Sequence, residues 1–307
     1  MHDENARMPG MCHRLLSRVL AALAVLVLVA GCSTTTAIET VGPPPPPPGP
    51  PTKYSALVVD AATGETLHQV NATAARYPAS LTKMMTLYLT FEALDQGRLS
   101  KSTLIPVSQV AARQPPSRIG LKSGQTIDVE SAILALSVKS GNDVAVALAE
   151  YLGGSEEAFA RQMTARARQL GMSGTTFRNA SGLPDPEQQT TARDMAVLGK
   201  ALRTRFPQHY HYFSEQAFNY NGRMVRGHND LLGRVEGVDG IKTGYIRASG
   251  YNIVTSVNSG GRRLIVVVMG ADSARARNAQ VEALIGQYRR EPAANAGGLI
   301  GSLFARN

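Results

Sequence analysis

The sequence predicts an α+β protein in which an antiparallel sheet is flanked by helices, with a helical subdomain beside the sheet. Strand-like runs occur near both ends of the folded part, over residues 54–72 and again beyond residue 236. Between these regions, apolar residues recur at helical spacing. Strands at both ends with helices between them favour a single sheet that is completed by both terminal segments.

The folded part opens with YSALVVDAATGETLHQVNA, which contains two short strand-like runs. The turn signal from Ala61 to Gly64 separates these runs and predicts a hairpin. Helical stretches follow, with glycines near their expected ends. Their sequences are LTKMMTLYLTFEAL, VESAILALSVKSGNDVAVALAEYL, EEAFARQMTARARQL and TARDMAVLGKALRTRF.

Strand-type alternation returns in GVDGIKTGYI, GYNIVTSVN and RRLIVVVMGA, which we expect to form successive antiparallel strands. The residues from Asn258 to Gly261 supply the turn between the last two strands. A final helix is expected near ARARNAQVEALIGQYRR, and residues 290–307 are expected to form a flexible tail.

The first residues of the chain predict an export signal that is not part of the fold. Arg14 and Arg18 precede the apolar run VLAALAVLVLVAG, which is shorter than the roughly twenty residues that span a bilayer. The residues VAGC resemble the lipobox of bacterial lipoproteins, which predicts a signal peptide over residues 1–31 and a lipid on Cys32. The alternative is a plain signal peptide followed by a chance cysteine.

Residues 32–53 are expected to form a tether between a membrane and a folded domain at residues 54–289. This stretch has almost no bulky apolar side chains, so it cannot form a packed core. Its six consecutive prolines, Pro43–Pro48, favour an extended polyproline II conformation. Because Ser33 is not the aspartate often associated with inner-membrane retention, we expect the periplasmic side of the outer membrane rather than of the inner one, in a bacterium with both.

The charge pattern argues against nucleic acid as a partner. The net charge of +9 comes from 32 basic and 23 acidic residues that are scattered along the chain. A basic surface suits the anionic polymers and headgroups of a cell envelope. His209 and His211 form a His-x-His pair, but FPQHYHYF supplies no acidic or cysteine ligand, and zinc needs three or four ligands. We therefore expect no metal and no cofactor.

The stretch YPASLTKMMTLYL places Ser80 three residues before Lys83, at the start of an apolar run. On a helix these two side chains share one face, so the lysine amine can receive the serine proton. This chemistry requires an environment that lowers the pKa of the lysine toward neutrality. A helix cap followed by a solvated lysine is the alternative interpretation of the pair.

Two further motifs make the chemical interpretation stronger. SVKSGNDVA places Ser140 and Asn142 in a polar break within an apolar helical stretch, where buried polar groups need partners. VDGIKTGYI brings Lys242, Thr243 and Gly244 toward the end of a predicted strand, where glycine lets a substrate backbone approach closely. A polar kink and an exposed strand end are the structural alternatives.

In this order, the motifs resemble the Ser-x-x-Lys, Ser-x-Asn and Lys-Thr-Gly set of penicillin-binding proteins and serine β-lactamases. YPASLTKMMT, SGNDVAVALAE, SGLPDPEQQTTARDMAVLGKAL and VDGIKTGYIRASGYNIV are similar to segments of the low-molecular-weight D-alanyl-D-alanine carboxypeptidases, serine peptidase family S11. The resemblance runs from Tyr54 to Arg289. It implies a DD-peptidase/β-lactamase-like fold and peptidoglycan stem peptides ending in D-Ala-D-Ala as substrates.

The resemblance also implies catalytic roles. Ser80 would be the nucleophile, Lys83 the base that takes its proton, and Ser140 a relay of protons to the leaving amine. The backbone N–H groups of Ser80 and Tyr245 would form the oxyanion hole. β-Lactams, which mimic D-Ala-D-Ala, would acylate Ser80 as covalent inhibitors.

Substrate-binding roles follow from the same resemblance. Asn142 would orient Lys83 and the substrate amide, and Lys242 would keep the site electropositive. Thr243 would bind the terminal carboxylate, and Gly244 would allow close approach of the substrate. Family members often carry an arginine shortly after the Met-Gly at the end of the last strand, where this chain has Asp272. Either Arg275 or Arg277 could substitute for that arginine.

A D-Ala-D-Ala carboxypeptidase is thus the leading interpretation. A DD-endopeptidase that cuts peptide cross-links with the same residues is the closest alternative, and a catalytically silent peptidoglycan-binding lipoprotein is another. A β-lactamase is disfavoured, because the segment after Asn142 lacks the Glu-x-x-Leu-Asn arrangement of class A enzymes.

Overall fold

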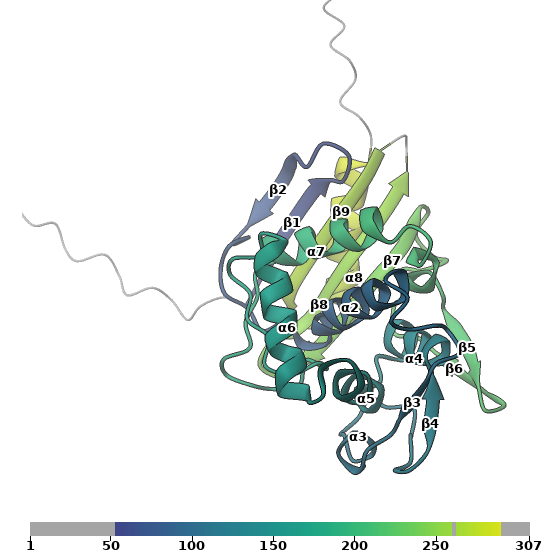
Figure 1. Cartoon of the computed structure of the whole chain (residues 1–307). Helices are drawn as coiled ribbons and strands as arrows, with labels where there is room; N and C mark the ends of the chain where they lie inside the picture. The colour runs from purple at the N-terminus through teal and green to yellow at the C-terminus, as the bar shows by residue number, and fades with distance from the viewer. Residues whose placement is uncertain (1–52, 260–261, 290–307) are drawn as a thin grey trace, which may run out of the picture. The chain divides into compact units, whose positions relative to one another are not determined.

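The computed structural model describes residues 53–259 and 262–289, and a five-stranded antiparallel sheet forms its centre (Figure 1). The strand order is β2-β1-β9-β8-β7. The strands are β1 (Ser55–Asp60), β2 (Thr66–Val70), β7 (Val238–Ile246), β8 (Gly250–Ser259) and β9 (Arg262–Ala271). The predicted fold class is confirmed, as are the N-terminal hairpin and the three later strands.

The two ends of the folded part meet in this sheet. β1 pairs with β9, with Leu57 opposite Val267, so the N-terminal hairpin extends the sheet beyond the last strand of the chain. β7 pairs with β8 and ends the sheet on the other side. The strand that carries Lys242 and Thr243 is therefore an edge strand among those that the structure describes.

Helices connect the two parts of the sheet, and two small sheets lie among them. The α-helices are α2 (Lys83–Asp95), α3 (Gln109–Ala112), α4 (Val129–Leu134), α5 (Asn142–Gly153), α6 (Glu156–Gln169), α7 (Ala192–Arg205) and α8 (Ala274–Tyr288). The short helices are η1 (Ala79–Thr82), η2 (Ala135–Lys139) and η3 (Tyr210–Phe213). The small sheets pair β3 (Leu104–Pro106) with β4 (Thr126–Asp128), and β5 (Ala217–Tyr220) with β6 (Arg223–Arg226).

The sequence-based prediction differs from the structure in two helical stretches. The stretch from Val129 to Leu152 is divided into α4, the π-helical turn η2 and α5, and the division falls at the polar break around Ser140. The helix expected to carry both Ser80 and Lys83 is also divided, because Ser80 lies in the 3₁₀ turn η1 and α2 begins at Lys83. In a 3₁₀ turn, residues three apart eclipse each other, so the two side chains still share one side.

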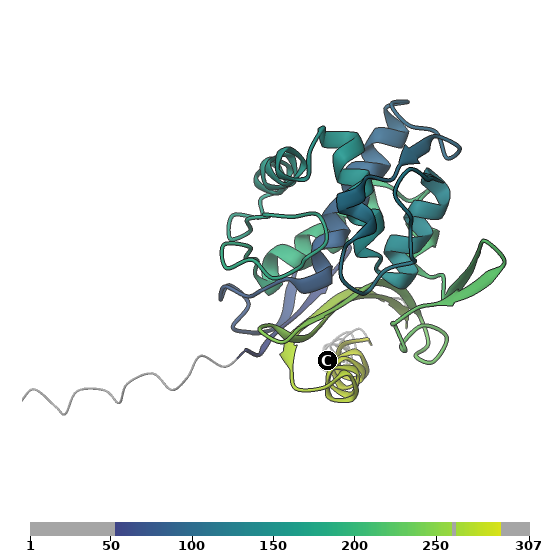
Figure 2. The same cartoon turned by 90° about the horizontal axis from the view of Figure 1, so that it is seen from below.

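Helices cover both faces of the sheet (Figure 2). On β9, Leu264, Val266 and Val268 belong to a core that includes Val281 and Ile285 of α8. The alternate residues of the strand, including Val267, belong to the larger core beneath the other helices. Because both faces are buried, the sequence of this strand is a continuous apolar run rather than an alternating one.

The helix α2 runs through the middle of the larger core. Met84, Met85 and Leu87 are fully buried, although their spacing places them on different sides of the helix. Phe91 stacks on His209 with ring centroids 5.0 Å apart, and Phe206 packs nearby. A helix that is apolar all round is stable only where it is buried all round. The charged residue Lys83 therefore begins a helix that is surrounded by protein.

Several predictions from the sequence fall outside the described residues. They are the signal peptide at residues 1–31, the lipid on Cys32, the tail at residues 290–307 and all of the tether except Lys53. Residues 260–261 of the predicted turn between β8 and β9 also lie outside them. Within the described residues, no helix is long and apolar enough to cross a membrane.

Candidate active site

The turn that carries Ser80 is fixed by contacts from the sheet. The Asn252 side chain on β8 is fully buried and donates from Nδ2 to the carbonyl oxygens of Tyr77 (3.0 Å) and Pro78 (3.2 Å). A Cβ at Gly244 of β7 would lie only 3.0 Å from the backbone nitrogen of Ser80. A side chain there would be tightly packed, because the edge strand packs directly on the backbone of the serine turn.

The Lys83 amine contacts three oxygen atoms, one of which is Ser80 Oγ. Its Nζ lies 3.2 Å from Ser80 Oγ, 2.7 Å from Asn142 Oδ1 and 2.5 Å from the carbonyl oxygen of Ser181. A neutral amine has two N–H bonds and one lone pair. It can therefore donate to the two carbonyl-type oxygens and accept the proton of the Ser80 hydroxyl group. The geometry matches the requirements of a base for Ser80.

The surroundings of Lys83 favour its neutral form. Burial lowers the pKa of Lys83 well below its ordinary value, and the positive charge of Lys242 lowers it further. Asp143 and Glu156 oppose this shift of the pKa, because their negative charges favour the ammonium form. Burial, followed by the charge of Arg277, lowers the pKa of Lys242 to about 7. Among the described residues, no carboxylate forms an ion pair with Lys83.

Ser140 lies where η2 ends, in a left-handed conformation with φ 63°. A non-glycine residue in this conformation is strained, and such strain concentrates at functional sites. The Ser140 side chain is buried, and its Oγ has no hydrogen-bond partner among the described residues. The neighbouring loop supports this segment, because Ser117 Oγ donates to the carbonyl oxygen of Lys139 and Asn142 Nδ2 donates to that of Pro115.

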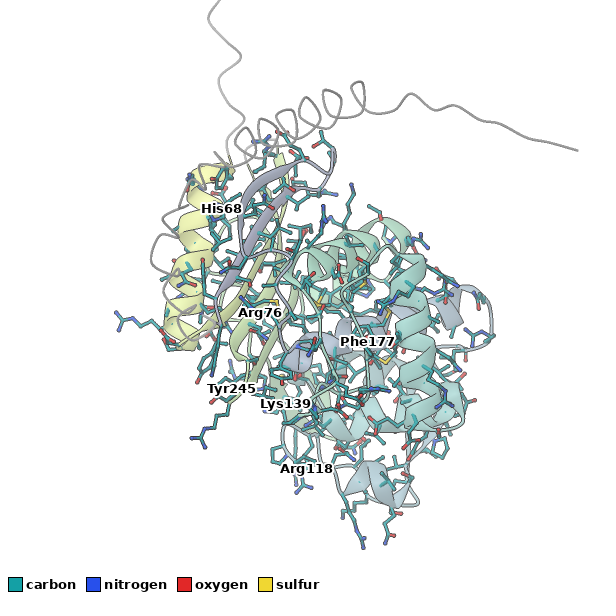
Figure 3. All side chains as sticks on the ribbon, turned by 90° about the vertical axis from the view of Figure 1, so that its left-hand side faces the viewer. His68, Arg76, Arg118, Lys139, Phe177 and Tyr245 are labelled. Atoms are coloured by element: carbon teal, nitrogen blue, oxygen red, sulfur yellow. The ribbon has the colours of Figure 1, made fainter. Side chains whose placement is uncertain are left out.

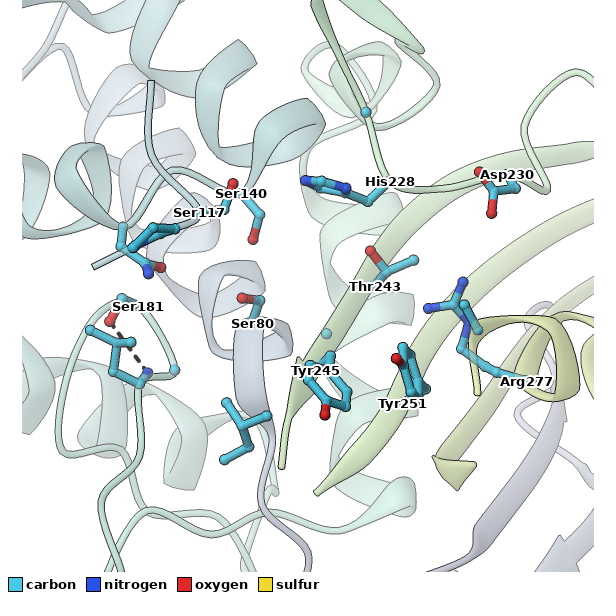
Figure 4. A pocket seen from close by; sticks show the side chains of 18 residues that line it. Ser80, Ser117, Ser140, Ser181, His228, Asp230, Thr243, Tyr245, Tyr251 and Arg277 are labelled. Carbon is cyan, nitrogen blue, oxygen red and sulfur yellow. Dashed lines mark hydrogen bonds between the residues drawn. The ribbon is translucent and has the colours of Figure 1, made fainter. Parts of the chain in front are cut away.

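The side chains of Lys242 and Thr243 point to opposite sides of β7. Lys242 is buried and donates from Nζ to the carbonyl oxygen of Thr243 at 2.9 Å. Thr243 lines the cavity above, together with Ser80 and Ser140. Figure 4 shows these three hydroxyl groups around the same space. Lys242 and Lys83 lie behind the lining residues, where they act through charge and hydrogen bonds.

Of Arg275 and Arg277, the structure brings Arg277 to the cavity. It is buried and lines the cavity, and its guanidinium group lies on the Thr243 side (Figure 4). Its Nε and Nη2 donate to Asn278 Oδ1 at 3.1 and 2.8 Å, which holds the group in place. Arg275 is exposed and lines a separate surface pocket, and Asp272 is also exposed. Although Asp272 stands where family members often carry an arginine, the cavity still has a buried cation, which is Arg277.

The cavity has a volume of about 660 Å³ and lies between the sheet and the helical subdomain. Figure 3 shows the side chains on the ribbon and labels Tyr245, which lies on β7 and lines the cavity. The Tyr245 side chain is exposed and packs on Tyr251, with ring centroids 4.3 Å apart. The cavity brings together Ser80, Ser140, Asn142, Thr243, Gly244 and Tyr245, all of which the sequence predicted.

Several residues at this site were missed by the sequence analysis. The carbonyl oxygen of Ser181 accepts a hydrogen bond from the Lys83 amine. At the next residue, Gly182, a Cβ would lie 1.9 Å from the Ala79 carbonyl oxygen. Glu156 Oε1 accepts a hydrogen bond from the Ala180 backbone nitrogen at 3.0 Å. SGLPDPEQQTTARDMAVLGKAL contributed to the family resemblance, but a backbone carbonyl contact leaves no signal in side-chain identity.

His209 and His211 have ordinary partners. His209 Nε2 lies 2.9 Å from Asp95 Oδ1, and His211 Nδ1 lies 3.1 Å from the Gln208 carbonyl oxygen. Among the described residues, no group of three His, Cys, Asp or Glu side chains could hold a metal ion.

An antiparallel sheet beside a helical subdomain, with these three motifs around one cavity, defines the DD-peptidase class of fold and site. The sequence profile of the D-alanyl-D-alanine carboxypeptidases, peptidase family S11, matches residues 48–273. The chain therefore belongs to this family. D-alanyl-D-alanine carboxypeptidase DacD of Escherichia coli K12 is 38% identical over 236 residues, which are 75% of this chain and 61% of that protein.

Solved structures show the same similarity. Penicillin-binding protein 5 from Haemophilus influenzae matches with a TM-score of 0.74 and 34% identity, over 78% of this chain and 71% of that chain. Penicillin-binding protein D2 from Listeria monocytogenes, solved in a cefotaxime-bound form, matches with a TM-score of 0.70 and 31% identity, over 78% of this chain and 98% of that chain. The chain spans about three fifths of the length of several curated relatives that it matches.

The negative charge of Glu156 raises the pKa of the Lys83 amine. In Glu156→Gln, the amide oxygen can still accept from Ala180, but the negative charge that favours the ammonium form is lost. We therefore expect the pKa of Lys83 to fall further. Lysine side-chain NMR across a pH series measures this, with the Lys83 signal identified by its absence in Lys83→Met.

Glu157→Gln is the matched control, because Glu157 is exposed and adjacent in the sequence. This variant should leave the pKa of Lys83 unchanged. An unchanged or raised pKa of Lys83 in Glu156→Gln would show that Glu156 does not stabilise the ammonium form.

Proposed function

We propose that this protein is a serine D-Ala-D-Ala carboxypeptidase that removes the terminal D-alanine from peptidoglycan stem pentapeptides. The observation that carries the proposal is the buried Lys83 amine, which lies 3.2 Å from the Ser80 hydroxyl group without an ionic partner among the described residues. Arg277 supplies a cation on the far side of the same cavity. A nucleophile with its base and a carboxylate-binding group are the parts that this reaction needs.

Acylation begins when Ser80 Oγ attacks the carbonyl carbon of the penultimate D-alanine. The hydroxyl proton passes to Lys83, and the backbone N–H groups of Ser80 and Tyr245 stabilise the negative charge that develops on the carbonyl oxygen. The amide C–N bond then breaks. The leaving amine takes a proton that comes from Lys83 through Ser140, and free D-alanine departs. The remaining peptide is held as an ester on Ser80.

Deacylation consumes one water molecule. The water attacks the ester carbonyl carbon and gives up a proton to Lys83, which then returns a proton to Ser80 Oγ as the ester C–O bond breaks. A β-lactam would acylate Ser80 by the same first steps, because its strained amide occupies the position of the scissile bond. The cefotaxime-bound relative supports this extension of the proposal.

The substrate carboxylate would be held between Thr243 and Arg277. A carboxylate in a partly enclosed cavity needs a charged partner. Arg277 is a buried cation that lines the candidate active-site cavity. Asn142 would bind the substrate amide while its Oδ1 keeps Lys83 in place. Lys242 would raise the electrostatic potential from behind Thr243.

The substitution Ser80→Ala tests the nucleophile. Full-length protein is incubated with purified muropeptides, and the products are analysed by mass spectrometry. We expect the wild-type protein to release one alanine from monomeric pentapeptides and Ser80→Ala to release none. Fluorescent penicillin should label the wild-type protein only. Labelling that persists in Ser80→Ala would remove Ser80 from its role, and an inactive wild-type protein would favour a silent peptidoglycan-binding module.

Replacing Arg277 by alanine should weaken recognition of the terminal carboxylate. We expect kcat/KM on pentapeptides to fall by about ten- to a hundredfold, mainly through KM, since a charge-assisted hydrogen bond is lost. Arg275→Ala is the control and should retain wild-type kinetics. Equal kinetics of the two variants would show that the carboxylate is bound elsewhere.

We also propose that Cys32 carries a lipid that anchors the protein on the periplasmic side of the cell envelope, with the outer membrane favoured if the cell has two membranes. The support is the lipobox-like VAGC and the Pro-rich stretch that follows it. In Cys32→Ser, we expect loss of fatty-acid labelling and release of the mature protein from the membrane fraction. A mature Cys32→Ser protein that remains membrane-bound would contradict the proposal.

A further inference from the structure

A second cavity adjoins the candidate active site, and His228 stands between the two. The second cavity has a volume of about 360 Å³ and is lined in part by Val138, Phe213 and Ile241. The two cavities share His228 and Thr243, together with Gly227 and Asp230. The short segment that carries His228 thus separates the candidate active-site cavity from the second cavity.

The segment that carries His228 is held in place at the preceding residue, Gly227. The Gly227 backbone nitrogen donates to the Gln216 carbonyl oxygen at 2.8 Å, and a Cβ at Gly227 would lie 3.3 Å from Val138 Cγ1. The His228 ring faces the backbone of Lys139, the residue before Ser140. The ring therefore reaches from the connection between β6 and β7 to the helical side of the cavity.

His228 also lies between two groups that would bind the leaving residue. In Figure 4, the ring extends from the Thr243 side toward Ser140. In the proposed reaction, the leaving amine is next to Ser140 and its carboxylate is next to Thr243 and Arg277. The α-carbon that joins this amine to this carboxylate must then lie between Ser140 and Thr243, in the part of the cavity that His228 lines. The wall that His228 forms there limits how large the side chain on that carbon can be.

We propose that His228 is a specificity-determining residue that closes the leaving-group end of the cavity and restricts the leaving group to one small D-amino acid. The inference rests on the proposed carboxypeptidase activity. The methyl group of D-alanine fits beneath such a wall. In a peptide cross-link, the leaving amine belongs to a diamino acid that carries a second stem peptide, and that chain has to pass through the space that His228 occupies.

The charge state of the ring agrees with a role as a wall. Burial and the positive charges of Lys242 and Lys139 lower the pKa of His228, while Asp230 opposes them. The ring is therefore neutral at pH 7. A neutral ring blocks space without offering a second cation to the substrate carboxylate, which leaves recognition of that group to Arg277.

The test compares two substrates in full-length protein, a monomeric pentapeptide muropeptide and a cross-linked dimeric muropeptide. His228→Ala would join the two cavities and admit the longer leaving group. We expect the ratio of kcat/KM for the dimer to kcat/KM for the monomer to rise about tenfold or more, because relief of a steric exclusion changes discrimination on this scale. His228→Gln, with a side chain of similar reach, should keep a ratio near that of the wild-type protein.

His211→Ala is the matched control, since His211 is an exposed histidine that does not line either cavity. An unchanged ratio in His228→Ala, or an equal rise in His211→Ala, overturns the inference. Fluorescent penicillin labelling shows whether each variant retains a folded site, and His228→Ser replaces His228→Ala if the latter does not label. A wild-type protein that releases no alanine from the monomer would instead contradict the carboxypeptidase proposal.

Discussion

The burial of the Lys83 amine is the constraint on which the rest of the site depends. A lysine removed from water and without an ionic partner among the described residues is costly in its charged form, so its surroundings favour loss of the proton. The contacts to Asn142 and Ser181 then use the two N–H bonds of the neutral amine. Its lone pair is left for the Ser80 hydroxyl group, 3.2 Å away. Burial and hydrogen bonding thus create a base from a residue that is ordinarily a cation.

Holding this amine in place requires several distant segments of chain to meet. The α2 helix carries Lys83, the start of α5 carries Asn142, and the loop before α7 supplies Ser181. Close packing marks the junctions, since Gly182 leaves no room for a Cβ against the backbone of the serine turn and Gly244 leaves little. The sheet provides the fixed surface, because β7 at its edge packs on η1 and positions Thr243. A firmly held base and nucleophile need little reorganisation during a reaction.

The sequence was most informative where a residue's chemistry is carried by its own side chain or by a strong local pattern. The last three strands were recognised from their alternation and apolar runs, and the three motifs named most of the cavity lining. Ser181 acts through its backbone carbonyl, and Asn252 acts by holding a turn 174 residues away, so neither has a local signature. The choice between Arg275 and Arg277 depended on which face of α8 meets the cavity, which only the packed structure defines.

The most direct test of this account is the pH dependence of Ser80 acylation by penicillin, measured as a second-order rate constant from pH 5 to pH 10. If Lys83 is the neutral base, acylation should already be fast at neutral pH and should fall on the acidic side as Lys83 gains a proton. Toward pH 10 the rate constant should not rise, because Lys242, whose pKa is about 7, loses its positive charge there. A rate constant that instead rises about tenfold per pH unit up to the ordinary lysine pKa near 10.4 would show that Lys83 is charged at neutral pH. That result would contradict the central claim.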